Sequence, residues 1–183
     1  MPRKFFRKYL PDPEAVRSSR LVAAFGAWLQ HPNLWHLNRR SVSGAVAIGL
    51  FSGLVPGPLQ MLTALLLAVP LRKNLPVALL VTLYTNPFTI VPLYLLAYAY
   101  GHLLLPGERV KQVTPFEFDW TNFGESMSEL GQWMLSLGKP LAIGLVALAC
   151  TFALLGYLAV QIAWRAYVVA AWRARARRRR ERA

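Results

Sequence analysis

Three long stretches of the sequence contain no charged residue. No Asp, Glu, Lys or Arg occurs in residues 41–71, 74–107 or 140–164. Each stretch exceeds the ~20 residues that a transmembrane helix needs to cross a bilayer, and 55% of the chain is hydrophobic. This lack of charge excludes an ordinary soluble domain. It predicts an all-α integral membrane protein, because helices satisfy their own backbone hydrogen bonds in lipid.

Residues that carry catalytic or metal chemistry are equally scarce. The single cysteine, Cys150, can form no disulfide within the chain, and the three histidines do not stand at metal-ligand spacing. We therefore expect no metal and no cofactor. The motifs of zinc proteases, serine hydrolases, P-loop proteins and dinucleotide-binding folds are absent. The absence of these motifs disfavours an enzyme. Carriers driven by protons usually keep a carboxylate within the membrane, so the uncharged stretches also disfavour simple proton antiport.

Acidic residues number only 8, against 21 lysines and arginines, and the two kinds are unevenly placed. The basic residues gather near both ends, whereas five of the acids lie in residues 106–139. Loops rich in lysine and arginine stay in the cytoplasm. We therefore predict a bacterial inner (plasma) membrane protein with both termini cytoplasmic and the 106–139 loop outside. Basic residues beside a span usually bind anionic lipid, so we expect membrane lipids as partners and no nucleic acid.

Two amphipathic helices are expected at the membrane interface. The first belongs to a basic cytoplasmic segment, residues 1–40, where it starts at Asp12-Pro13 and ends at His31-Pro32. Packing of this helix against the protein's own membrane domain is the alternative. The second starts at Asn122, where Glu125 completes a capping box. It carries apolar residues at helical spacing, namely Phe123, Met127, Leu130, Met134 and Leu137.

The first two uncharged stretches are interrupted in the middle, the first at residues 53–58 and the second at Thr85-Asn86-Pro87. The halves of the first stretch, 41–54 and 58–71, have 14 residues each. As helices they reach ~21 Å, less than the ~30 Å hydrocarbon core. Because Arg72-Lys73 favours the cytoplasmic side, we predict that residues 41–71 form a re-entrant hairpin. A kinked full span is the alternative.

The predicted architecture is a broken or re-entrant helical hairpin plus about two full transmembrane helices, with interfacial amphipathic helices. The membrane domain extends over residues 41–165. In order, it contains the re-entrant or broken helix 41–71, a broken transmembrane helix at 75–105, an external loop with an amphipathic helix at 106–139 and a transmembrane helix at 140–164. A cytoplasmic arginine-rich tail, residues 166–183, follows.

An ordered series of motifs marks the membrane domain. It comprises Leu34-Trp35-His36-Leu37-Asn38-Arg39-Arg40-Ser41-Val42, Ala47-Ile48-Gly49-Leu50-Phe51, Gly53-Leu54-Val55-Pro56, Pro58-Leu59-Gln60-Met61, Asn74-Leu75-Pro76-Val77, Thr85-Asn86-Pro87-Phe88-Thr89 and Pro92-Leu93-Tyr94. Together these motifs resemble the bacterial membrane family catalogued as domain of unknown function 2062, across residues 30–160. Ser43-Gly44 departs from the basic residue expected in many relatives.

The resemblance implies no particular activity, because the family has no established one. Some relatives resemble parts of proteins that also contain glycosyltransferase domains. This relation implies envelope or lipid-linked sugar chemistry, with envelope or glycosyltransferase proteins as partners.

Polar residues gather around the two interruptions. Gly57-Pro58 and Asn86-Pro87 each have the form of a half-helix start, whose N–H groups attract anions. Two arginines at the cytoplasmic mouth are able to hold a phosphate. The candidate binding residues are therefore Gly57, Pro58, Gln60, Thr85, Asn86, Thr89, Arg39 and Arg40. We hypothesise that the protein transports or handles an anionic lipid or a lipid-linked head group at these half-helix N-termini.

Two alternatives stay open. The polar side chains can instead satisfy backbone groups at two kinks, while Arg39 and Arg40 only set the orientation. The chain can also be a non-catalytic membrane scaffold, or a partner protein for envelope biosynthesis enzymes. A polar cavity at both interruptions supports the binding site, whereas a dry and filled interior there supports the scaffold.

Overall fold

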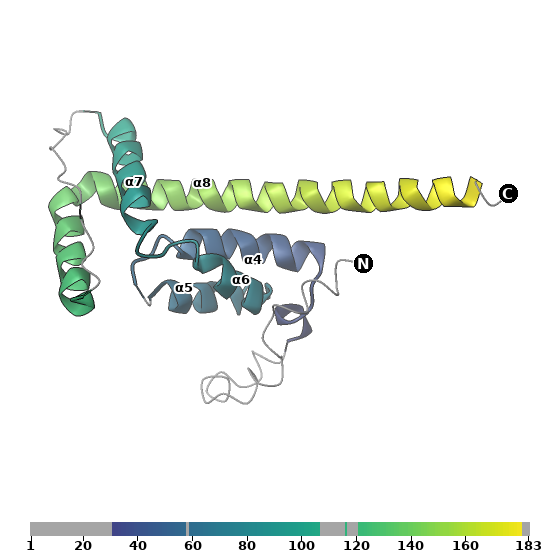
Figure 1. The fold of residues 1–183 in the computed structure, drawn as a ribbon, viewed down its shortest axis with the longest axis horizontal. Coiled ribbons are helices and arrows are strands. Elements are labelled where there is room, and N and C mark those ends of the chain that lie inside the picture. The colour runs from purple at the N-terminus through teal and green to yellow at the C-terminus, as the bar shows by residue number, and fades with distance from the viewer. Residues whose placement is uncertain (1–30, 58, 107–115, 117–120, 181–183) are drawn as a thin grey trace. The chain divides into compact units, whose positions relative to one another are not determined.

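All regular structure in the described residues is helical. The computed structural model describes residues 31–57, 59–106, 116 and 121–180 (Figure 1). Its elements are η1 (Pro32–Leu34), α4 (Arg39–Ser52), α5 (Leu59–Ala68), α6 (Leu75–Thr82), α7 (Ile90–Leu104) and α8 (Phe123–Arg180). The chain divides into two compact units, Met1–Thr82 with Ala153–Ala183 (unit 1) and Leu83–Phe152 (unit 2). The expectation of an all-helical chain is confirmed for the described residues, and the amphipathic helix expected before His31 lies outside them.

Helix α4 has a well-defined start and end. Asn38 caps it, because its Oδ1 accepts a hydrogen bond of 2.8 Å from the amide of Ser41. The Ser41 hydroxyl donates to the carbonyl of Asn33 at 2.8 Å and so ties η1 to the same end. The helix ends at Ser52, with Gly53 as its C-cap, before a turn in which Gly57 has a φ of +63°. Glycine adopts this left-handed conformation without steric cost, so the expected interruption at residues 53–58 is present.

Helices α4, α5 and α6 form a tight group in unit 1 (Figure 1). Along α4, Gly44 lies against the Lys73 side chain, and Gly49 lies against Ala78 and Val81. Helices α4 and α6 therefore run parallel, with their starts at the same end. Helix α5 must run back between these two ends, so the chain returns to the end at which α4 begins. This is the path that the hairpin interpretation predicts for residues 41–71.

The core of unit 1 consists of small and branched side chains. Alanines are fully buried on all three helices of the group, which lets the helix backbones approach closely. The buried cluster comprises Leu34, Ala45, Ile48, Ala64, Ala68, Val69, Leu75, Val77 and Ala78.

The last part of α8 also belongs to unit 1 and packs on α4 in the opposite direction. Gly156 lies against the side chains of Leu50 and Val46. Nearer to the start of α4, the Gln161 Nε2 donates to the Ser43 hydroxyl at 3.2 Å. Because α8 continues to Arg180, it extends well past the start of α4. Residues 166–180 of the expected arginine-rich tail are therefore helical.

Helix α8 is two helices joined at a kink. Gly138 has φ 63° and ψ −145°, which are not helical angles and which essentially only glycine adopts. Pro140 then stands in the first turn of the second helix, where its missing N–H leaves no hydrogen bond unmade. The kink separates the amphipathic helix, which begins at Phe123 as expected, from the long apolar helix (Figure 1).

In unit 2, helices α7 and α8 cross at two glycines. A Cβ atom on Gly101 would lie 1.8 Å from the Pro140 carbonyl oxygen, and one on Gly144 would lie 1.8 Å from the Ala97 carbonyl oxygen. The backbones are therefore in direct contact at this crossing. Tyr94 is fully buried beside this crossing. Small residues at a helix crossing are typical of helices that associate without a hydrophobic driving force.

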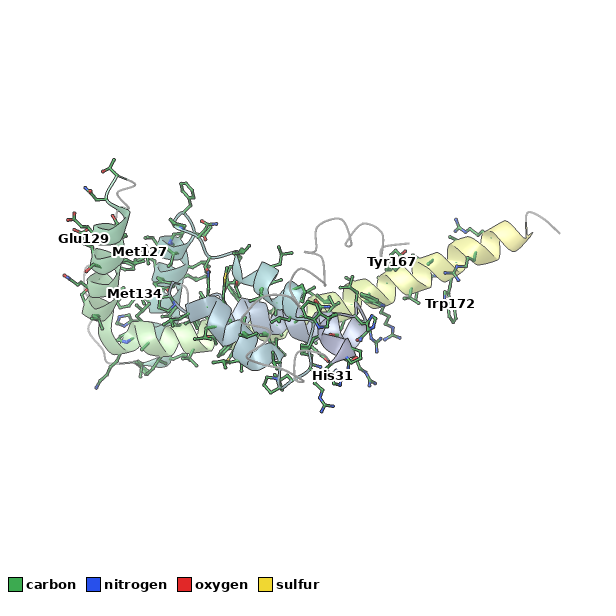
Figure 2. The ribbon with its side chains drawn as sticks, turned by 90° about the horizontal axis from the view of Figure 1, so that it is seen from below. His31, Met127, Glu129, Met134, Tyr167 and Trp172 are labelled. Carbon is green, nitrogen blue, oxygen red and sulfur yellow. The ribbon has the colours of Figure 1, made fainter. Side chains whose placement is uncertain are left out.

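One described helix is long and apolar enough to cross a membrane, within Gly124–Arg175. Only 17% of its most apolar window is buried, which differs from the buried central helix of a soluble protein. Figure 2 shows Tyr167 and Trp172 on its last part, and these side chains are 48% and 70% exposed. Large apolar side chains are also exposed on the shorter helices, including Leu62, Leu66, Leu80, Leu96 and Leu103.

Candidate functional site

The structure separates the candidate residues into groups. Arg39 and Arg40 lie at the start of α4, whereas Gly57 and Gln60 follow its other end. The length of α4 places these two pairs about 20 Å apart. Thr85, Asn86 and Thr89 belong to unit 2, and Pro58 lies outside the described residues. Within unit 1 the arginines therefore do not share a site with the Gly57 turn.

The turn at Gly57 is closed by its own backbone. The amide of Gln60 donates to the Gly57 carbonyl at 3.3 Å, and the amide of Val55 donates to the Ser52 carbonyl at 3.0 Å. The Ser52 hydroxyl is fully buried and has no hydrogen-bond partner among the described residues. The two backbone hydrogen bonds of the turn satisfy groups that lipid could not satisfy.

The interruption before α7 is held by a reciprocal cap. Asn86 Oδ1 accepts hydrogen bonds from the amides of Phe88 and Thr89, at 3.0 and 3.1 Å. In return, the Asn86 amide donates to the Thr89 hydroxyl at 3.0 Å, and this hydroxyl donates to the Tyr84 carbonyl at 2.7 Å. Thr85 is buried beside the cap, with an exposed fraction of 8%. Because these amides of the turn before α7 already have acceptors, the geometry favours a structural role for Asn86 and Thr89.

The arginines at the start of α4 have neighbours that the sequence reasoning did not assign to a site. Arg72 and Lys73, from the turn between α5 and α6, return to this end of unit 1. The Lys73 Nζ donates a long hydrogen bond of 3.5 Å to the Arg40 carbonyl. We call Arg39, Arg40, Arg72 and Lys73 the basic cluster. It joins cations that are 33 residues apart in sequence.

The Lys73 side chain is held in place by a recess on α4. A Cβ atom on Gly44 would lie 2.6 Å from the Lys73 Cδ and 2.7 Å from its Cε. The absence of a side chain at Gly44 therefore makes the room in which the aliphatic part of Lys73 lies. The turn that carries Lys73 is also fixed, because the buried Asn74 Oδ1 accepts a 3.0 Å hydrogen bond from the Val77 amide and caps α6.

No described carboxylate balances the basic cluster. The described carboxylates, Glu125 and Glu129, both belong to unit 2. The start of a helix adds partial positive charge to the same place. Arg165 adds a further cation, because it follows Gln161 by one turn of α8 and Gln161 contacts Ser43 near the start of α4. Positive charge that gathers at one place attracts anions.

Sequence reasoning used Arg72-Lys73 only to choose an orientation, and Arg165 only as the end of a span. The isolation of Arg72 and Lys73 was a signal for a site, since these two are the only charged residues between Ser41 and Gly107. Gly44 was noted only as a departure from the basic residue expected in relatives. Its contact with Lys73 links α4 to the turn before α6, which local spacing does not reveal.

The comparisons with known proteins identify a family and no activity. Among the described residues, no group of three or more His, Cys, Asp or Glu side chains could hold a metal ion. No curated protein and no solved structure matches the chain. A family model described as "uncharacterized protein conserved in bacteria" matches residues 22–173. The chain therefore belongs to this bacterial family, domain of unknown function 2062.

Proposed function

We propose that the protein is an integral protein of the bacterial inner membrane that binds anionic lipid head groups at its basic cluster. The observation that carries this proposal is the convergence of Arg39, Arg40, Arg72 and Lys73 at one end of an apolar helix group, with no described carboxylate beside them. Cations at this position meet the phosphates of the cytoplasmic leaflet, where each is worth about 1 kcal/mol.

The exposed apolar side chains support placement in a bilayer. In water, the leucines exposed on α5, α6 and α7 would form an unfavourable surface. The uncharged residues 140–164 of α8 reach ~37 Å, enough to cross the hydrocarbon core with some tilt. The arginines that follow them belong in the cytoplasm, which puts residues 106–139 outside.

The lengths of the helices support a hairpin that enters the bilayer without crossing it. Helix α4 has 14 residues and α5 has 10, which correspond to ~21 and ~15 Å. Neither can cross ~30 Å of hydrocarbon alone. With the basic cluster at the cytoplasmic surface, the Gly57 turn lies within the membrane. The backbone bonds that close this turn are what such a position requires.

Binding of a short-chain lipid tests the proposal. The protein, purified in an uncharged detergent, is titrated with dioctanoyl phosphatidylglycerol and, separately, with dioctanoyl phosphatidylcholine at low salt. We expect the anionic lipid to bind at least about tenfold more tightly, because several cations face one phosphate surface. Phosphatidylcholine has the same chains and no net charge, so it reports the apolar contribution.

Matched variants locate the site. The first carries Arg39→Gln, Arg40→Gln, Arg72→Gln and Lys73→Gln together. The control removes four cations elsewhere, through Lys139→Gln, Arg173→Gln, Arg175→Gln and Arg177→Gln. We expect the first variant to lose the preference for phosphatidylglycerol and the control to keep it. Equal behaviour of the two variants, or equal binding of the two lipids by the unchanged protein, contradicts the proposal.

A further inference from the structure

We infer that the basic cluster recognises a lipid whose head group ends in a phosphomonoester or diphosphate, and that Lys73, seated on Gly44, sets this preference over a phosphodiester. The inference rests on the proposed function and names the ligand class of the same site. It follows from the charge of the cluster, from the fixed position of Lys73 and from the apolar surface that leads to it.

The first step is charge. Four cations converge at the start of α4, Arg165 approaches from α8, and no described carboxylate of unit 1 faces them. A phosphodiester lipid brings one negative charge to this place. A terminal phosphate brings close to two at neutral pH and exposes three acceptor oxygens. Arginine forks and a lysine ammonium can share these oxygens, so the terminal phosphate is the better electrostatic match.

The second step is the position of Lys73. A free lysine would swing its ammonium away from other cations and from the positive start of a helix. Here the chain after Arg72, which has a φ of +52°, and the recess at Gly44 direct the lysine toward the Arg40 carbonyl. Much of the side-chain freedom of Lys73 is therefore already lost before a ligand arrives. A cation fixed in this way favours a ligand that can pair with it and with the arginines together.

The third step separates a lipid from a soluble phosphate. Leu71 stands immediately before the basic cluster, and Leu66 lies little more than one turn earlier on α5; both are more than half exposed. An acyl or prenyl chain attached to a phosphate at Lys73 can lie against this apolar surface. Inorganic phosphate or pyrophosphate would make no such contact, so the lipid is the ligand that uses both parts of the surface.

The experiment compares dioctanoyl phosphatidic acid with dioctanoyl phosphatidylglycerol in the same detergent at about pH 8, where the phosphomonoester is a dianion. We expect the unchanged protein to bind phosphatidic acid about tenfold more tightly. The uncharged variant Gly44→Ala displaces the flexible Lys73 side chain rather than backbone. It should therefore fold, and it should lower the preference to about twofold, because phosphatidic acid loses more affinity than phosphatidylglycerol does.

A second site variant and a control complete the design. Lys73→Gln should lower the preference for phosphatidic acid in the same way, and it tests the inference even if Gly44→Ala does not fold. Gly131→Ala, which has no atom within 4 Å of the added Cβ, should change nothing. Equal binding of the two anionic lipids, or an unchanged preference in both site variants, overturns the inference. The proposed function stands in that case if phosphatidylglycerol still exceeds phosphatidylcholine.

Inorganic pyrophosphate is the probe for a soluble ligand. We expect it to displace phosphatidic acid only at concentrations at least about tenfold higher than those at which phosphatidic acid itself binds. Displacement at equal concentrations would show that the site takes soluble phosphates, which overturns the lipid part of the inference.

Discussion

An alanine at the crossing of α7 and α8 should destabilise the protein, although alanine normally favours a helix. The Cβ atom of Gly101→Ala would lie 1.8 Å from the Pro140 carbonyl oxygen and 2.7 Å from its carbon. Ordinary contact begins at 3.4 Å, so the two backbones must separate by roughly 1.6 Å locally. The neighbouring atom belongs to a backbone and cannot swing aside. Gly144→Ala meets the Ala97 carbonyl in the same way.

The magnitude follows from two opposing terms. Replacement of a helical glycine by alanine stabilises a helix by ~1 kcal/mol. Overpacking of a tight contact costs ~1–3 kcal/mol, and a clash with backbone belongs at or above the upper end. We expect a net loss of about 2 kcal/mol, which corresponds to a fall in Tm of roughly 4–8 °C for a chain of this length.

Thermal unfolding in detergent, followed by circular dichroism, measures this effect. Gly131→Ala is the matched control, because it lies on the first part of α8 with no atom within 4 Å of the added Cβ. It should gain up to ~1 kcal/mol from helix propensity alone. If Gly101→Ala melts at or above the temperature of Gly131→Ala, the helices do not cross at these glycines.

Three further predictions concern unit 1, the cap before α7 and the lipid site. Gly49→Ala should lower the Tm by several degrees, because its Cβ would lie 2.6 Å from the Ala78 carbonyl oxygen. Gly44→Ala should shift the Tm by less than about 2 °C, because its Cβ meets only the Lys73 side chain. Equal Tm shifts of the two variants would argue against the parallel packing of α4 and α6. Asn86→Leu should lower the Tm, because it removes two hydrogen bonds that hold the turn before α7 and are together worth ~1–2 kcal/mol. Phosphatidylglycerol affinity should stay unchanged, and weaker lipid binding at an unchanged Tm would return Asn86 to the site. Phosphatidylglycerol affinity should fall severalfold between about 50 and 500 mM salt as screening increases, and titrations that show no salt dependence would exclude an electrostatic site.

The positions of the helix interruptions were predictable from local chemistry. Gly57 and the Asn86-Pro87 pair mark where a helix ends and another begins, and the structure has both interruptions there. Asn122 correctly marked the start of α8. These features depend on one or two residues and on general preferences for caps and turns, so sequence alone contains them.

The contacts that shape the candidate site were less accessible. The reciprocal bonding of Asn86 and Thr89 occupies amides that the half-helix hypothesis left available for an anion. The recess of Gly44 under Lys73 joins residues 29 positions apart, and no local pattern predicts it. The sequence placed Arg72 on the same side of the membrane as the arginines of α4 only because lysine and arginine prefer the cytoplasm. The proposed lipid site therefore lies at the end of the hairpin, where non-local contacts bring cations together, and not at the helix interruptions.

The central claim is that the hairpin of α4 and α5 returns Arg72 to the cytoplasmic surface. Single cysteines at Arg72→Cys and Ser128→Cys, in a chain whose only native cysteine is removed by Cys150→Ser, can be labelled with a membrane-impermeant maleimide. We predict that the cysteine at position 72 reacts in inverted inner-membrane vesicles and not in spheroplasts, while that at position 128 does the opposite. Labelling of both positions from the same side of the membrane would contradict the account.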